Sequence, residues 1–268
     1  MASIAGWIYD KPLRGNYTFT HKEVVETFKD ISVATIARAL TREVSKRRIM
    51  SPMRGFYVIV PDEYVIRGAV PQSFYLDDMM HYLGRKYYVA LLSAASYHGA
   101  SHQVPLRFSV MIEPPAMRDK KSEKYLTHYF CKSHITEAYV ERRQTRTGYI
   151  NISTPELTAV DLITHQAKSG SVTRAATVLA ELVEKMDFGG LSADFVKEVP
   201  VSSLQRLGYI LEDVLEEQEA ADAVYDLLKR AGARLQTVAL KAGKDAAGAG
   251  MNERWKIKVN ETIEIDEL

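Results

Sequence analysis

The sequence has a single cysteine, Cys131, and no apolar run that approaches the roughly 20 residues needed by a membrane-spanning helix. One cysteine excludes an internal disulfide and is typical of a reducing compartment. The N-terminus lacks the charged and apolar pattern of a signal peptide. We therefore expect a soluble cytoplasmic protein.

Net charge is also nearly absent, because the 268 residues carry a formal charge of only +1. Whole-chain charge thus predicts no polyanionic partner, and the distribution of charge matters more. Residues 11–60 contain ten Lys/Arg and four Asp/Glu, whereas residues 181–231 contain five Lys/Arg and twelve Asp/Glu. The chain is long enough for one small and one larger domain, with a positive segment near its start and a negative one later.

Metal-binding signatures are incomplete. His98 and His102 have the i, i+4 spacing of helical zinc sites, but Gly99 stands where a zinc protease has its catalytic glutamate. A buried or capping histidine explains His98 better. A second set has three members spaced three apart and no fourth ligand nearby: His128, Cys131 and His134. We expect no metal.

Catalytic signatures are missing too. Glu156 and Asp161 lie five positions apart, so on a helix they point in different directions, and the first-turn position of Glu156 suits the helix dipole. The sequence has no phosphate-cradling glycine loop and no Gly-x-Ser-x-Gly motif. We expect neither enzyme activity nor a cofactor.

Residues 20–60 are the most informative stretch. Thr20 and Glu23 have the spacing of a capping box, which predicts a helix over 21–28. A short turn follows, and Ser32 can cap a second helix. We also expect a first helix over 4–9, packed through Ile4, Trp7 and Ile8.

The second helix is amphipathic. Its predicted apolar face has five members: Val33, Ile36, Ala37, Leu40 and Val44. The opposite face carries candidate DNA contacts, namely Thr35, Arg38, Arg42, Ser45 and Lys46. Arginine is the side chain best suited to a bidentate contact with guanine.

A hairpin is predicted over 49–60, with its turn at 52–55 and a strongly β-prone second strand. Its basic residues would lie near the DNA backbone: Arg47, Arg48 and Arg54. Two helices and a hairpin predict a winged helix-turn-helix DNA-binding domain over 1–68. The alternatives are a solvated basic face, or a winged helix that contacts only proteins.

The rest of the chain, 69–268, predicts a larger mixed α/β domain, so the fold class is α+β. We expect a linker at 68–71, a flexible glycine-rich segment at 242–250, strands over 108–112, 125–130, 138–142, 149–152 and 255–259, and helices over 74–83, 87–98, 154–164, 172–186, 201–211 and 220–230. A second basic cluster, Arg142, Arg143 and Arg146, with Lys120, Lys121, Lys124 and Lys132, could extend the DNA surface or simply cover an exposed sheet face.

Four motifs occur in a recognisable order: GFYVIVPDEY (55–64), YYVALLSAASYHGASHQ (87–103), GYINISTPELTAVDLI (148–163) and ATVLAELVE (176–184). In this order and spacing the chain resembles AbiEi-like proteins, the antitoxin and transcriptional regulator of AbiE-type, type IV toxin–antitoxin systems. The resemblance implies an N-terminal winged helix that represses the protein's own operon, through promoter DNA that contains inverted repeats, and a C-terminal antitoxin domain. It also implies a nucleotidyltransferase-like toxin that is neutralised without a stable complex.

Three other functions stay open. Some relatives are solitary regulators, so a neighbouring toxin does not follow from the resemblance. The acidic helices over 181–231 could instead bind a basic toxin directly. An enzyme such as a nuclease, targeted by the winged helix, is the least favoured because no catalytic motif is present.

Overall fold

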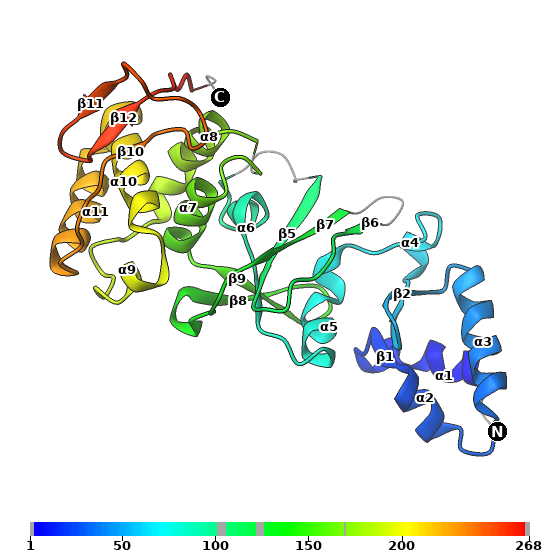
Figure 1. Cartoon of the computed structure of the whole chain (residues 1–268). Helices are drawn as coiled ribbons and strands as arrows, with labels where there is room; N and C mark the ends of the chain where they lie inside the picture. Colours follow the sequence, from blue (N-terminus) through cyan, green and yellow to red (C-terminus); the bar gives the residue numbers. More distant parts are fainter. Residues whose placement is uncertain (1–2, 101–105, 122–125, 169, 266–268) are drawn as a thin grey trace. The chain divides into compact units, whose positions relative to one another are not determined.

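The computed structural model describes residues 3–100, 106–121, 126–168 and 170–265 (Figure 1). The chain is a mixed α+β protein with several sheets, as the sequence predicts. It divides into two compact units. Unit 1 comprises Met1–Tyr88, Leu106–Ile135 and Arg142–Asn151, and unit 2 comprises Val89–Pro105, Thr136–Glu141 and Ile152–Leu268. The predicted boundary after residue 68 stays a prediction.

Unit 1 begins with helices around a small antiparallel sheet (Figure 1). The elements are α1 (Ile4–Asp10), the 3-10 turn η1 (Pro12–Arg14), β1 (Thr18–Thr20), α2 (His21–Thr27), α3 (Val33–Ser45), β2 (Ile49–Met53) and β3 (Phe56–Ile59). The strand order is β1-β3-β2, so β1 adds a third strand that the sequence analysis missed. The hairpin turn is shorter than predicted, because Pro52 and Met53 belong to β2.

A larger sheet follows, and most of its residues belong to unit 1. Its elements, with the helices that precede it, are α4 (Asp62–Val65), η2 (Gln72–Phe74), α5 (Leu76–Tyr82), β4 (Tyr87–Val89), β5 (Arg107–Ile112), β6 (Lys120–Lys121), β7 (Leu126–Cys131), β8 (Val140–Gln144) and β9 (Tyr149–Ser153). The strand order is β6-β7-β5-β4-β9-β8, with β5 and β7 parallel over six residue pairs. The chain passes into unit 2 at Val89 in β4, at Thr136 after β7 and at Ile152 in β9.

The predicted helix over 87–98 is wrong in its first part. Tyr87, Tyr88 and Val89 form a central strand, and the helix α6 begins only at Leu91. All three strand residues are at most 4% exposed. A strand buried on both faces shows no alternation, so its apolar run cannot be separated from a buried helix by periodicity alone. The predicted linker is also partly buried, since Ala69 and Val70 lie in the core.

Unit 2 is mainly helical. Its elements are α6 (Leu91–Tyr97), η3 (Glu137–Tyr139), α7 (Pro155–Thr164), α8 (Val172–Leu182), η4 (Val183–Lys185), α9 (Phe195–Glu198), α10 (Val201–Tyr209), the π-helical turn η5 (Ile210–Val214), α11 (Gln218–Arg230), β10 (Val238–Ala239), β11 (Gly250–Asn252) and β12 (Ile257–Val259). Thr154 caps α7 by accepting from the Leu157 amide, and Pro155 occupies the first turn, as predicted. Helix α7 is buried along most of its length, and α6, α8 and α10 pack around it.

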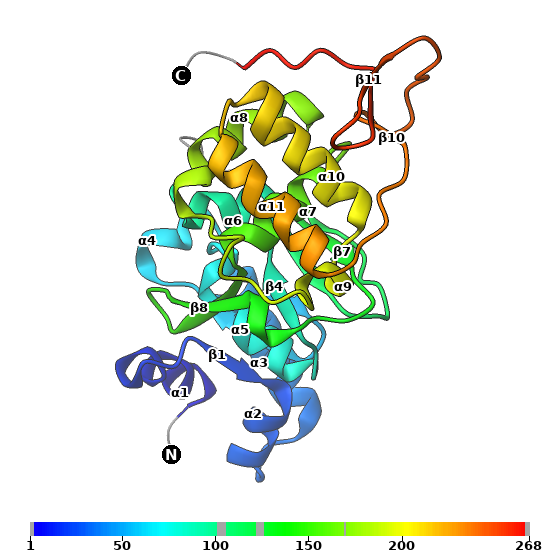
Figure 2. The same ribbon diagram turned by 90° about the vertical axis from the view of Figure 1, so that its left-hand side faces the viewer.

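Trp255 fixes the C-terminal strands to helix α10, which runs beside α11 (Figure 2). Its ring is fully buried against Gly208, where an added Cβ would lie only 2.1 Å from the ring carbons. The indole N–H donates to Glu212, whose carboxylate also pairs with Arg254. The absence of a side chain at Gly208 therefore makes room for the tryptophan.

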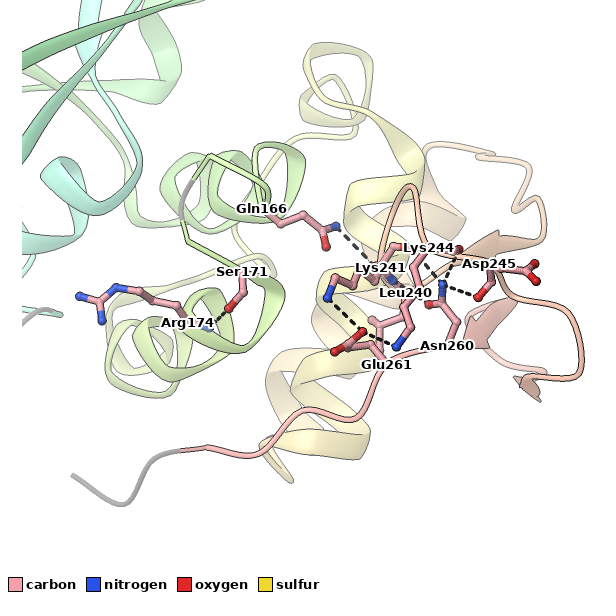
Figure 3. Close-up of polar contacts among 9 residues, drawn as sticks. All are labelled: Gln166, Ser171, Arg174, Leu240, Lys241, Lys244, Asp245, Asn260 and Glu261. Carbon is pink, nitrogen blue, oxygen red and sulfur yellow. Dashed lines mark hydrogen bonds and ion pairs between the residues drawn. The ribbon is translucent and has the colours of Figure 1, made fainter.

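The glycine-rich segment after β10 is held by Asn260 (Figure 3). The side-chain Nδ2 of Asn260 donates to the backbone carbonyls of Lys241 (3.1 Å) and Lys244 (2.9 Å). Its Oδ1 accepts from the backbone amide of Lys241 at 2.9 Å. Glu261 pairs with both lysine side chains. The start of the segment predicted to be flexible thus has specific hydrogen bonds.

Candidate nucleic-acid interface

Helices α2 and α3 begin where the sequence predicts. The Thr20 hydroxyl accepts from the Glu23 amide at 3.1 Å, and the Glu23 carboxylate accepts from the Thr20 amide at 2.6 Å, which completes the capping box. The Ser32 hydroxyl accepts from the Thr35 amide at 3.2 Å and caps α3. Five residues lie between the two helices, so their relative direction is fixed over a short distance.

A small apolar core orients α3. Ile36 and Leu40 are buried together with Phe19, Val24 and Ile49. Ile4 and Ile8 of α1 belong to the same cluster and Trp7 packs against it, as predicted. This core anchors one face of α3 and leaves the other to solvent.

The predicted apolar face of α3 is only partly correct. Val33 is 56% exposed, Val44 is 39% exposed, and Ala37 is also exposed. Glu43, which the sequence analysis did not assign to this face, is buried at 4% exposure. The buried stripe is narrow because this core is small, so apolar residues at its edge remain in solvent.

Arg38 and Arg42 lie on the exposed face of α3. Within the described ranges, neither guanidinium makes a hydrogen bond, an ion pair or a ring contact. Thr35 and Ser45 share this exposure, but their hydroxyls have local contacts. Thr35 Oγ1 lies 2.9 Å from the Ser32 hydroxyl, and Ser45 donates to the Arg42 carbonyl. The two arginines are thus the groups on this face most available to an external partner.

Lys46 and Arg48 share the carboxylate of Glu43. Lys46 Nζ lies 3.4 Å from one oxygen, and Arg48 Nη1 lies 3.7 Å from the other. The Arg48 guanidinium also lies over the Tyr9 ring, 5.2 Å from its centroid. Both cations remain about half exposed at 46–47% of their side-chain surface, so they can reach an anion, although Glu43 offsets part of their charge.

Arg47 ends helix α3 with an unusual backbone. Its φ of +59° is left-handed, a conformation that helices commonly use just past the C-cap and that glycine adopts most easily. Its guanidinium donates to the Ile66 carbonyl at 3.3 Å and packs along Gly68. The side chain therefore connects α3 to the segment after α4.

Arg54 lies at the tip of the β2–β3 hairpin. Its side chain is exposed, and in the described part of the chain it has no charged partner. Its carbonyl accepts from the Tyr82 hydroxyl at 3.2 Å, so α5 supports the turn. Gly55 follows with a φ of +77°, which the turn requires.

The second basic cluster is less available. The Arg142 guanidinium lies 4.6 Å from the Tyr149 ring centroid, and Arg146 pairs with Glu63. Arg143 is exposed and also has an interaction with another residue. Of the four lysines in the predicted extension, Lys120 is exposed and Lys132 is half-buried, while Lys124 and the side chain of Lys121 lie outside the described residues.

The histidines and acidic residues with metal-like or catalytic spacing in the sequence make structural contacts. His98 is buried, with Nε2 2.8 Å from the Ser153 carbonyl, as a core histidine should be. His102 lies outside the described residues. His128 and His134 pair with different carboxylates, Asp119 and Glu113. No metal-binding group of three or more His, Cys, Asp or Glu occurs among the described residues.

The Glu156 carboxylate is likewise occupied, because it accepts from the Asp187 amide at 2.7 Å.

In the part of the chain that the structure describes, no helix is both long and apolar enough to cross a membrane.

Comparison with known proteins supports the antitoxin resemblance. Residues 88–213 match the family model of the AbiEi antitoxin C-terminal domain. The RV2827C protein from Mycobacterium tuberculosis has a similar crystal structure, with a TM-score of 0.65 and 16% sequence identity, over 94% of this chain and 88% of that one. That identity shows a shared fold alone. No curated protein matches the sequence significantly.

Proposed function

We propose that this chain, an AbiEi-like antitoxin, also binds DNA in a sequence-specific manner and represses its own operon. The observation that carries the proposal is the pair of exposed, unpaired arginines, Arg38 and Arg42, on helix α3. A guanidinium without an internal partner has its donors free for a bidentate contact with the O6 and N7 atoms of guanine.

The N-terminal elements support a winged helix-turn-helix assignment. Helix α2, a short turn, helix α3 and the β2–β3 hairpin follow one another in the order of that module. We assign α3 as the helix that enters the major groove, with Arg38, Arg42, Thr35 and Ser45 toward the bases. Because its donor is bonded to the Arg42 carbonyl, Ser45 would act as an acceptor toward a base amine.

Phosphate contacts are assigned to the basic residues that flank α3: Lys46, Arg47, Arg48 and Arg54. Arg54 is the strongest of these candidates, because Lys46 and Arg48 share Glu43 and Arg47 already donates to Ile66. Phosphate contacts fix the register of a protein on DNA, whereas base contacts give sequence preference. Arg142, Arg143 and Arg146 are a secondary phosphate surface in this proposal.

The match of residues 88–213 to the AbiEi antitoxin C-terminal domain supports an antitoxin role. We propose a type IV arrangement, in which the chain counters a nucleotidyltransferase-like toxin without forming a stable complex with it. Repression through an operator with inverted repeats would keep toxin expression low. Restored growth on co-expression with the neighbouring gene product, without co-purification, is the expected result.

A promoter–reporter fusion tests repression directly. The wild-type chain should lower expression from the DNA upstream of its own gene, and the double variant Arg38→Ala/Arg42→Ala should not. Arg234→Ala is the matched control, because Arg234 is an exposed arginine of unit 2 without an ion pair among the described residues. Repression by the double variant equal to that of the wild type would contradict the assignment of α3 as the helix that contacts the bases.

A second function has its own support. Three glutamates near the start of α11, Glu216, Glu217 and Glu219, are exposed and have no ion pair within the described ranges. This acidic segment suits direct binding of a basic toxin surface. Co-purification of the neighbouring gene product, lost on charge reversal of these residues, would favour it over control through DNA.

A further inference from the structure

Unit 1 contains a cavity of about 280 Å³ behind strand β2. Val70 and Met79 form an apolar part of its lining and are only 1–2% exposed. Met50 and Pro52 of β2 form another side. A volume near 300 Å³ is at the lower end for small-molecule sites, which suits one ring with a short side chain.

Six of the twelve lining residues carry a polar side-chain group, and these groups differ in availability. Gln72 Nε2 donates to Thr127 Oγ1 at 3.0 Å, and both side chains are 4% exposed. Thr127 thereby uses one lone pair of its hydroxyl, and no acceptor for its hydrogen occurs among the described residues. The Ser51 hydroxyl, in contrast, already bonds to hairpin carbonyls.

Lys120 gives the cavity its charge. It is the one cation in the described lining, it is exposed, and it has no ion pair in the described part of the chain. Tyr129 also lines the cavity, and burial, with a smaller effect of Asp119, raises its pKa to about 12. The phenol therefore stays neutral near pH 7, and Lys120 is the charged lining group that would attract an anion.

We propose that this cavity binds a small aromatic carboxylate, with the ring against Met50, Val70 and Met79 and the carboxylate at Lys120. Ligand sites usually combine apolar side chains with oriented polar groups, and this lining has both. The single free cation selects an acid over its uncharged amide, because an amide of the same size gains the apolar contacts and not the charge–charge attraction.

Two contacts join this cavity to the elements assigned to DNA. Met50 and Pro52 belong to β2, the first strand of the hairpin that carries Arg54. Gly68 also lines the cavity and packs against the side chain of Arg47, at the end of α3. We therefore expect the ligand to change DNA affinity. This regulatory consequence rests on the proposed function, whereas ligand binding does not.

Titration calorimetry with 3-phenylpropanoate and with 3-phenylpropanamide tests the site on the full chain. The acid should bind with a Kd below about 1 mM and at least about fivefold more tightly than the amide. Lys120→Gln should remove this difference while leaving amide binding unchanged. The control Lys258→Gln, an exposed lysine of unit 2, should leave both affinities unchanged. Thr127→Val should weaken binding of the acid without removing its preference over the amide.

Equal affinities for acid and amide, or an acid affinity that Lys120→Gln does not change, would overturn the proposal. So would the absence of binding up to about 5 mM. The DNA consequence is measured separately, as operator affinity with and without saturating 3-phenylpropanoate, with an expected change of at least about threefold. Loss of DNA binding without ligand would contradict the proposed function and leave the calorimetric result standing.

Discussion

Lys46 Nζ lies 3.4 Å from the carboxylate of Glu43, a residue that is 4% exposed on the inner face of the same helix. Glu43 also pairs with Arg48, so one buried carboxylate offsets two cations that the proposed function assigns to DNA. Under the proposed function, this arrangement would limit charge-driven binding to DNA of arbitrary sequence.

Glu43→Gln should therefore strengthen binding to random DNA. Without the carboxylate, Lys46 and Arg48 are free for phosphates, and the slope of log K against log salt should steepen by about 1 to 2. Arg48→Ala should flatten the same slope. Fluorescence anisotropy across a salt series measures both.

Glu26→Gln is the matched control, since Glu26 is an exposed glutamate of α2 that pairs with Lys22. An unchanged slope in Glu43→Gln, or the same change in Glu26→Gln, would contradict the role given to Glu43.

We expect Val33 to contact a thymine methyl group. It is 56% exposed at the start of α3, where recognition helices reach base edges. Replacing one contacted thymidine by deoxyuridine removes a methyl group worth about 0.8 kcal/mol, so it should weaken wild-type binding about fourfold. The same replacement should not change the affinity of the Val33→Ser variant. Leu13→Ser, an exposed apolar residue outside α3, should keep the wild-type response. A scan in which no deoxyuridine distinguishes wild type from Val33→Ser would exclude this contact.

Gly208→Ala should destabilise unit 2. The added Cβ would lie 2.1 Å from the buried Trp255 ring, so either the ring or helix α10 must move, at a cost of about 1–3 kcal/mol or more. Urea unfolding followed by tryptophan fluorescence measures the change in free energy. Gly250→Ala is the control, because no atom lies within 4 Å of its added Cβ and its φ is not left-handed. Equal unfolding midpoints for the two variants would show that packing of the Trp255 ring does not require a glycine at position 208.

His165 makes stability depend on pH. Burial, with a smaller effect of Lys168, lowers the pKa of this imidazole below its usual 6.5. The unfolded chain therefore binds a proton first as pH falls below about 6.5, and stability is lost until the folded-state pKa is reached. His165→Gln should reduce the loss of unfolding free energy between pH 7 and about 5. Parallel pH profiles for the two proteins would contradict this.

Local signals in the sequence predicted much of the N-terminal region. The Thr20–Glu23 capping box and the Ser32 cap involve residues three apart, so spacing alone identifies them. Burial was harder to predict. Periodicity placed Val33 and Val44 inside and did not identify Glu43, because the width of the buried stripe depends on how much core lies opposite the helix.

Contacts between residues distant in sequence could not be predicted. Strand β1 pairs with β3 some forty positions later, and neither strand indicates that partner on its own. The same holds for the contact between Gly208 and Trp255. It also holds for the ion pair of Arg146 with Glu63, which leaves Arg146 less available as a predicted DNA contact. Charge in the sequence identifies cations, but only the fold shows which of them are already paired.

The most direct test is fluorescence anisotropy on the DNA upstream of the chain's own gene against a random duplex, for wild type and Arg42→Ala. Wild type should bind its own DNA several hundredfold more tightly, with a steep salt dependence. Arg42→Ala should lose about 1–3 kcal/mol on that DNA and little on the random duplex. Equal, weak binding of wild type to both duplexes would contradict sequence-specific repression.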